Sequence, residues 1–226
     1  MLAIFKKEMK TYFLKKLGEI KGEELYTDYS SVRNAIEKSG FFREIKGVEP
    51  NLSDHSEKHI QDVFERAFKV IGKEEFYKFD VYEIYCLAVM ILFHDVGNIF
   101  GRKGHEAKEK IAEIYNEYRK NNQNYRDERR AIIIGASAHS GKSKLGNGDT
   151  LKDIKDVSIK GNKIRLRELS AILRFSDELA EGKHRTCSFL VEKKLYDEGS
   201  SIFHKYAEIT DIEIDVIFRV YYRIWN

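Results

Sequence analysis

Residues 81–97 read VYEIYCLAVMILFHDVG, and this stretch decides how the rest of the chain is interpreted. Between Ile84 and Phe93 nearly every side chain is apolar, which predicts a helix buried on all sides at the centre of a helical bundle. The run is too short to cross a bilayer, which needs about 20 apolar residues. The buried helix ends in His94-Asp95, and an ionised aspartate there loses hydration that a cation or several hydrogen-bond donors must replace.

Helical spacing marks most of the chain around this stretch. The single proline, Pro50, and the scarcity of glycine through the first two thirds of the chain favour long helices. We predict helices at about residues 4–19 and 23–39, followed by a loop from Gly40 to Pro50. Further helices are predicted from Ser53 or Asp54 to about Ile71, at 81–95, at 105–120, at 126–139 and, after a polar loop at 140–162, along the stripe Leu166, Leu169, Leu173 and Ala180.

The pattern changes near the C-terminus. Beyond about residue 184 apolar and polar residues begin to alternate, most clearly from Ile212 to Phe218, and a period of two predicts strands. The expected fold class is therefore mostly α. It consists of a helical bundle at 1–183 and a small β-rich extension at 184–226 that packs on it.

The overall charge excludes a global attraction to nucleic acid or to a membrane. The 40 basic and 37 acidic side chains leave a net charge of +3, so only a local basic rim could attract phosphate. The N-terminal stretch has neither the uninterrupted apolar segment nor the cleavage site of an export signal. Cys86 and Cys187 lie far apart and predict packed thiols, without a disulfide or a thiolate metal site. We expect a cytoplasmic protein with no membrane association.

Histidines and aspartates beside apolar helical stripes are the candidates for chemistry. His59, His94 and His139 each end or flank such a stripe, although a single histidine at a helix edge is more often structural. Asp177 occupies the buried stripe of a late helix, where an ionised carboxylate needs a cation or several donors. With Asp95 these residues form a nitrogen and oxygen ligand set without thiolate. Such a set suits iron, manganese, zinc, nickel or cobalt better than calcium, and it leaves positions open for water and substrate.

The order His59, His94-Asp95 and Asp177 resembles the HD superfamily of metal-dependent phosphohydrolases. The resemblance rests on H-x-x-x-V at the first histidine, on the apolar run into H-D-x-G, and on the late-helix motif LRFSDEL, and it covers a motif core of about 50–180. It implies that these four residues hold a divalent metal ion. It also implies that a metal-activated water attacks the substrate phosphorus, with Asp95 as the catalytic residue.

Superfamily members that bind two metals carry two further histidines between the His-Asp pair and the last aspartate. His105, in GRKGHEA, and His139, in SAHSGK, occupy the matching intervals. The resemblance thus implies that Asp95 bridges to a second ion held by these histidines. We therefore expect one or two divalent transition metal ions and no organic cofactor. His55, one helical turn before His59, either competes for the first ion or is a surface or supporting residue.

The candidates for binding phosphate are the cations nearest in sequence to these ligands, Arg102, Lys142 and Arg185, unless they are solvated loop charges. The Glu-Asp pair of the guanosine tetraphosphate hydrolases and the Gly-Tyr-Pro signature of the cyclic dinucleotide phosphodiesterases are both missing. The deoxynucleotide triphosphohydrolases are similar around HDVGNIFGRKGHE, but Asn98 stands where they usually carry a histidine. HD nucleases, and HD domains fused to GHKL-type ATPases, are similar as well.

We therefore expect a phosphohydrolase that cleaves a phosphoester or phosphoanhydride bond in a nucleotide or nucleic acid. The choice between phosphodiesterase, nucleotidase and nuclease stays open, and a separate or fused ATPase partner and a homo-oligomer are both compatible with the sequence. The alternative is a catalytically reduced module that senses a nucleotide or binds a partner through its C-terminal strands. A third interpretation is that the histidines are structural and the likeness is limited to the fold.

Overall fold

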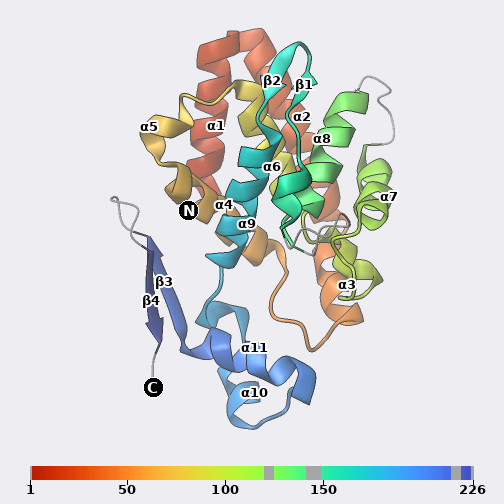
Figure 1. Cartoon of the computed structure of the whole chain (residues 1–226), viewed down its shortest axis with the longest axis vertical. Helices are drawn as coiled ribbons and strands as arrows, with labels where there is room; N and C mark the ends of the chain where they lie inside the picture. Colours follow the sequence, from red (N-terminus) through yellow and green to blue (C-terminus); the bar gives the residue numbers. More distant parts are fainter. Residues whose placement is uncertain (1, 120–124, 141–148, 215–219, 225–226) are drawn as a thin grey trace.

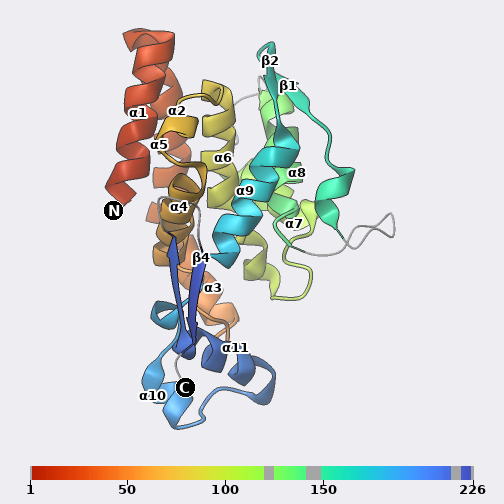
Figure 2. The same cartoon turned by 60° about the vertical axis from the view of Figure 1, so that its left-hand side comes forward.

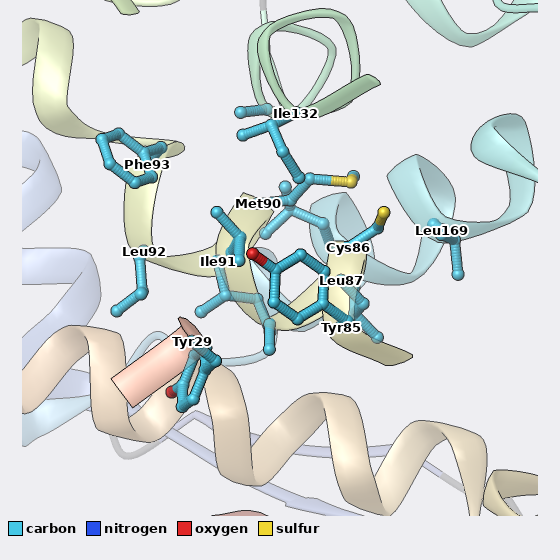
Figure 3. Close-up of a cluster of buried hydrophobic side chains, with 14 of the residues drawn as sticks. Tyr29, Tyr85, Cys86, Leu87, Met90, Ile91, Leu92, Phe93, Ile132 and Leu169 are labelled. Carbon is cyan, nitrogen blue, oxygen red and sulfur yellow. The ribbon is translucent and has the colours of Figure 1, made fainter. Parts of the chain in front are cut away.

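Helix α6 (Val81–Phe93) is the axis around which the other helices pack (Figure 1). The computed structural model describes residues 2–119, 125–140, 149–214 and 220–224. Every residue of α6 except Tyr82 is buried, and its side chains form one cluster with Tyr29, Ile132 and Leu169 from neighbouring helices (Figure 3). The helices that contact α6 include α2 (Glu19–Lys38), α4 (Glu57–Ile71), α8 (Arg126–Ser137) and α9 (Leu166–Glu178).

The remaining elements cover this core or extend from it. Helix α1 (Leu2–Leu17) packs along α2, and α3 (Phe41–Val48) contacts the 3-10 helix η1 (Val96–Phe100). The others are α5 (Lys73–Phe76), α7 (Lys108–Tyr118), the 3-10 helices η3 (Thr150–Asp153) and η4 (Lys183–Arg185), the antiparallel hairpin of β1 (Val157–Ile159) and β2 (Asn162–Ile164), α10 (Ser188–Glu192), α11 (Glu198–Ile209), and the antiparallel hairpin of β3 (Thr210–Ile214) and β4 (Val220–Ile224). Both views place α10 and α11 at one end of the bundle, beyond the end of α9 (Figures 1 and 2).

The expected mostly α fold is confirmed, but several elements were not predicted from the sequence, among them α3 and the β1–β2 hairpin. Helix α3 lies in the predicted loop before Pro50, and it is eight residues long and buries only Phe42 and Ile45, too few to show a period. The β1–β2 hairpin lies in the predicted polar loop at 140–162. Its strands are three residues each, joined through Lys160-Gly161, both at positive φ as a tight two-residue turn requires.

The segment after residue 184 is only partly β-rich, contrary to expectation. Helices α10 and α11 occupy most of its first half, and the strands begin at Thr210. The alternation predicted from Ile212 onward is confirmed in β3, while 215–219 lie outside the described residues. Helix α11 was missed because its Ile, Phe and Tyr side chains favour strands, yet Asp197 caps it by accepting a hydrogen bond from the Ser200 amide at 2.7 Å. The domain boundary at 183/184 stays a prediction.

The apolar segment Val81–Phe100 is long and apolar enough to cross a membrane by length and composition alone. However, 89% of its most apolar 18 residues are buried inside the folded chain, as a core helix requires.

The two cysteines, both expected to be packed thiols, have different surroundings. Cys86 is buried in α6, as expected. Cys187 is exposed, so the expectation of a packed thiol is wrong there.

The start of α6 is defined by a capping box. The Asp80 carboxylate accepts a hydrogen bond from the Tyr82 amide at 2.8 Å, and the Glu83 carboxylate accepts one from the Asp80 amide at 3.0 Å. Glu83 is buried and also accepts two hydrogen bonds from the Arg165 guanidinium, at 2.8 and 2.7 Å. Because Arg165 directly precedes α9, this pair holds the first turns of α6 and α9 together.

Replacement of Asp80 by alanine tests the capping box. We expect Asp80→Ala to lower the free energy of unfolding by about 1 kcal/mol, because the first turn of the central helix loses its side-chain acceptor. Asp80→Ser, which keeps an acceptor oxygen, should retain most of the stability. Urea unfolding followed by circular dichroism measures both variants, and equal stability of the two would contradict the cap.

Candidate metal centre

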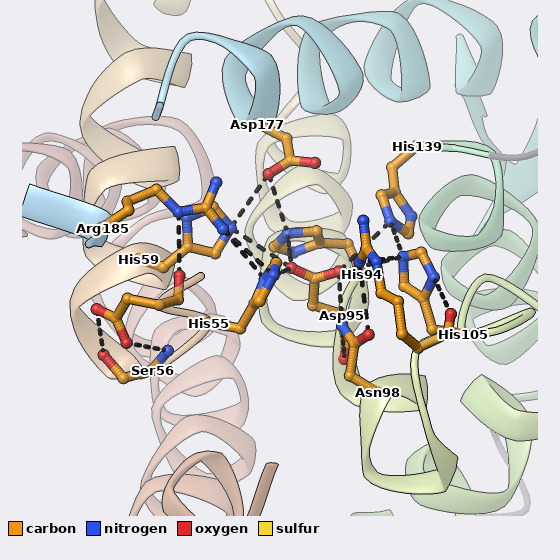
Figure 4. A network of polar contacts seen from close by, with 12 residues as sticks. His55, Ser56, His59, His94, Asp95, Asn98, His105, His139, Asp177 and Arg185 are labelled. Carbon is orange, nitrogen blue, oxygen red and sulfur yellow. Dashed lines mark hydrogen bonds and ion pairs between the residues drawn. The ribbon is translucent and has the colours of Figure 1, made fainter. Parts of the chain in front are cut away.

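Six side chains from separate parts of the chain converge at the end of α6 (Figure 4). They form two groups that could each hold a metal ion, and Asp95 belongs to both. The first group is His59 on α4, His94 and Asp95 after α6, and Asp177 in the last turn of α9; the second is Asp95, His105 before α7 and His139 after α8. Within each group one ligand atom per residue lies within 4.8 Å of all the others.

The end of α6 explains how consecutive residues face the same point. His94 keeps helical backbone angles, whereas Asp95 leaves the helix at φ −104° and ψ 2° and starts η1. In a continuing α-helix the two side chains would point about 100° apart. The change of backbone instead brings His94 Nε2 to 3.1 Å from Asp95 Oδ2.

The first group has the features of a metal site. His59 Nε2 lies 3.1 Å from Asp177 Oδ1 and 3.4 Å from Asp95 Oδ2, and His94 Nε2 lies 3.6 Å from the same Asp177 oxygen. Both histidines are fully buried. Neither ring nitrogen of His59, nor Nε2 of His94, has a hydrogen-bond partner among the described residues. Buried polar atoms are rarely left unpaired, so these nitrogens and carboxylates fit a cation between them.

The second group uses the other oxygen of Asp95. His105 Nε2 lies 3.4 Å and His139 Nε2 lies 3.5 Å from Asp95 Oδ1. The two Nε2 atoms are 3.1 Å apart. Two imidazole lone pairs that face each other and a carboxylate need a proton or a metal ion between them, so this group also fits a cation.

Hydrogen bonds behind the ligands set the orientation of three imidazole rings. The Nδ1 atoms of His94, His139 and His105 lie 2.8, 2.6 and 3.2 Å from the carbonyl oxygen three residues earlier in the chain. A carbonyl only accepts, so each Nδ1 carries the proton and each Nε2 presents its lone pair to the centre. This arrangement is the usual support of a metal-binding histidine.

Electrostatics favours a positive charge at the centre. Burial would raise the pKa of Asp95, but the imidazoles of His94, His55, His105 and His139 around its carboxylate hold that pKa well below its usual range. Burial would likewise raise the pKa of Asp177, but the nearby imidazoles of His59 and His94 lower it well below its usual range. Both carboxylates are therefore ionised at neutral pH and present anionic oxygens to a cation.

His55 is a supporting residue and lies outside both ligand groups. It is buried, and its Nδ1 lies 2.7 Å from Asp95 Oδ2. Burial lowers the pKa of His55 to about 4, so the ring is neutral at pH 7 and donates its Nδ1 proton to Asp95. The spacing of four residues to His59 was the only signal for this position in the sequence. It could not tell a ligand from a residue that orients one.

Asn98, where the resemblance to the triphosphohydrolases led us to expect a histidine, also orients Asp95. The side chain is fully buried, and its amide nitrogen lies 3.1 Å from both the backbone oxygen and Oδ1 of Asp95. An amide cannot exchange a proton as an imidazole does. The position therefore supports Asp95 and supplies no acid or base.

A pocket of about 500 Å³ opens onto the two groups, with Asp95, Asp177, His105 and His139 among its lining residues. Arg102 lines it, is exposed, and has Nη1 at 3.2 Å from His105 Nε2, so a phosphate bound beside the second group would meet this guanidinium.

Arg185 and Lys142 are the other two cationic side chains that the sequence suggested for phosphate binding. Arg185 lines the pocket but is buried, and its guanidinium donates to the Asp54 carbonyl at 3.0 Å, reaches Glu181 at 3.3 Å and has Nη2 at 3.4 Å from His55 Nε2. Much of its hydrogen-bonding capacity therefore holds the pocket wall together. Lys142 lies outside the described residues.

Gly97 explains the glycine of the H-D-x-G motif. A Cβ atom at this position would lie 1.8 Å from the His105 carbonyl oxygen, so only glycine allows η1 to pass this closely behind a ligand. The need for glycine here comes from backbone packing and not from backbone conformation, since Gly97 does not have a positive φ. The close approach places His105 beside Asp95.

Comparison with known proteins identifies one family. A family model described as HD-CE matches residues 49–221, a stretch that contains every residue of the two ligand groups and continues through α10 and α11. No curated protein and no solved structure matched the chain.

The Gly97 contact can be tested against a glycine that has free space. We expect Gly97→Ala to lower the free energy of unfolding by about 1–3 kcal/mol, because the methyl group forces the two backbones apart. Gly47→Ala in α3 meets nothing within 4 Å and should be neutral or stabilising by about 0.5–1 kcal/mol. Urea unfolding compares the two, and a Gly97→Ala variant as stable as the unmodified protein would contradict the packing argument.

Proposed function

The chain belongs to the HD-CE family, and from this premise we propose that it is a metal-dependent phosphohydrolase that cleaves a phosphoester or phosphoanhydride bond in a nucleotide or nucleic acid. The observation that carries the proposal is the shared carboxylate of Asp95, which offers one oxygen to each ligand group on the lining of a pocket. Substrate entering this pocket meets both groups at once.

The donor set supports transition metal ions. Four imidazoles and two carboxylates, with no thiolate, suit iron, manganese, zinc, nickel or cobalt. Bound divalent ions supply Lewis-acid chemistry, since they lower the pKa of water toward neutrality and neutralise charge on a phosphoryl group. The three or four protein ligands of each group leave further positions for substrate and water.

The protein's own residues hold this arrangement rigid. His55 and Asn98 donate hydrogen bonds to Asp95 from two directions and orient its carboxylate toward both groups. Arg102 stands beside His105, where its guanidinium would neutralise a phosphoryl oxygen. These contacts orient the reacting groups before substrate arrives, which is the main contribution of a protein to phosphoryl transfer.

A second candidate function follows from Asn98. Because this buried amide replaces a group able to exchange protons, the site also suits a module that binds metal and nucleotide with little or no turnover. Such a module would retain a nucleotide and release no product. A separate or fused ATPase and a second copy of this chain are further proposals for its partners.

Replacement of Asp95 tests the shared carboxylate. We expect the purified protein to bind about two divalent ions per chain and to hydrolyse bis(p-nitrophenyl) phosphate in the presence of Mn²⁺. Asp95→Asn should lose both properties, because one substitution removes an anionic ligand from both groups. Elemental analysis by mass spectrometry and absorbance of released nitrophenol are the measurements.

The control is Asp156→Asn, which changes an exposed carboxylate paired with Lys163. It should leave metal content and turnover unchanged. Metal at 100 times its Kd should also raise the free energy of unfolding by about 2.7 kcal/mol for each site it fills, an effect that Asp95→Asn removes. A folded protein that binds metal and nucleotide without product would support the sensing module, and one that binds no metal would overturn both candidates.

A further inference from the structure

The C-terminal segment supplies a wall of the pocket whose chemistry differs from that of the metal ligands. Residues Asp197, Gly199, Ser200 and Phe203, from the start of α11, line the same pocket as Asp95 and Asp177. Phe203 is 66% exposed although it lies at the pocket. We propose that Phe203 forms a nucleoside subsite, so that the substrate is a nucleoside monophosphate whose base stacks on this ring. The inference rests on the proposed function and narrows its substrate.

The position of Phe203 is held by its neighbour in the helix. His204 is 1% exposed, and its Nε2 donates to the Asn51 carbonyl oxygen at 2.8 Å while its Nδ1 accepts from the Thr186 hydroxyl at 2.9 Å. The ring also stacks on Tyr196 at 3.5 Å between centroids. These contacts join α11 to Asn51, which also lines the pocket. They therefore hold Phe203, the residue before His204 in the helix, at the pocket.

Charge around the pocket opposes a long polyanion. Besides Asp95 and Asp177, four carboxylates line it together with the guanidinium groups of Arg102 and Arg185: those of Glu49, Glu178, Glu181 and Asp197. One phosphate beside the metal groups and Arg102 is favoured, but the further phosphates of a nucleic-acid strand would face like charge. Carboxylates are instead good acceptors for sugar hydroxyls and base amino groups.

Size and stacking point to the same class of ligand. A pocket of about 500 Å³ falls within the usual range of small-molecule sites, about 300–1,000 Å³. An exposed phenyl ring offers a face to any base, independent of sequence. Hydrolysis here would consume one water: its oxygen bonds to phosphorus, the phosphorus–oxygen bond to the nucleoside breaks, and a proton passes to the nucleoside hydroxyl. The products are a nucleoside and inorganic phosphate.

The test compares AMP with ribose 5-phosphate, which lacks the base, and measures the binding of adenosine separately. AMP and ribose 5-phosphate serve as substrates of the Mn²⁺-loaded protein, and adenosine, which carries no phosphate to be cleaved, serves as the probe in isothermal titration calorimetry. We expect Phe203→Ala to raise KM for AMP and Kd for adenosine about tenfold and to leave KM for ribose 5-phosphate unchanged. Phe203→Trp, which keeps an aromatic face, should retain the KM for AMP and the Kd for adenosine of the unmodified protein. Ile202→Ala, at an exposed neighbour that does not line the pocket, should change neither.

The outcomes separate this inference from the proposed function. If the protein hydrolyses ribose 5-phosphate and AMP equally and Phe203→Ala affects neither, the subsite is wrong and the phosphohydrolase stands. If adenosine binding depends on Phe203 but no ester is hydrolysed, the subsite stands and the proposed activity fails. Higher kcat/KM on single-stranded DNA than on AMP, or tighter binding of choline phosphate than of AMP, would overturn the nucleoside monophosphate.

Discussion

The buried charge of Asp95 is the constraint on which the rest of the structure depends. The residue is 2% exposed, and five imidazoles, those of His55, His59, His94, His105 and His139, place a ring nitrogen within 3.5 Å of its carboxylate. An ionised carboxylate in the interior is strongly destabilising unless it is compensated. The imidazoles that compensate this charge come from the ends of α4, α6 and α8 and from the loops before α4 and α7. The bundle is therefore organised around one charge.

The surrounding backbone is adapted to the same purpose. Helix α6 is buried on nearly all sides, which makes it the fixed reference for the other helices, and it ends one residue before His94. Three ligand histidines use the same local device, an Nδ1 hydrogen bond to the carbonyl three residues earlier, which needs no distant partner. Gly97 then lets the following turn pass against His105. His94, His105 and His139 are therefore oriented without a bound metal ion.

The C-terminal segment takes part in this site. Arg185 and Asp54 exchange hydrogen bonds, the Asp54 amide with the Arg185 carbonyl at 3.0 Å and the Arg185 guanidinium with the Asp54 carbonyl at 3.0 Å. His204 joins α11 to Asn51 in the same stretch before α4. The HD-CE match extends to residue 221 and includes this segment. The pocket is thus closed by residues that follow the last metal ligand in the sequence.

The sequence by itself determined the central helix, the mostly α fold and the candidates His59, His94, Asp95, His139 and Asp177, because apolar patterning and an unpaired buried charge are local signals. His105 was indicated only by the resemblance to the HD superfamily. The sequence could not determine α11, whose Ile, Phe and Tyr side chains favour a strand until the Asp197 cap and the His204 contacts hold them in a helix. Nor could it assign His55 as the residue that orients Asp95, or Arg185 as a buried tether. Those roles depend on contacts between residues 40 and 131 positions apart. Only the packed bundle brings such residues within hydrogen-bonding distance.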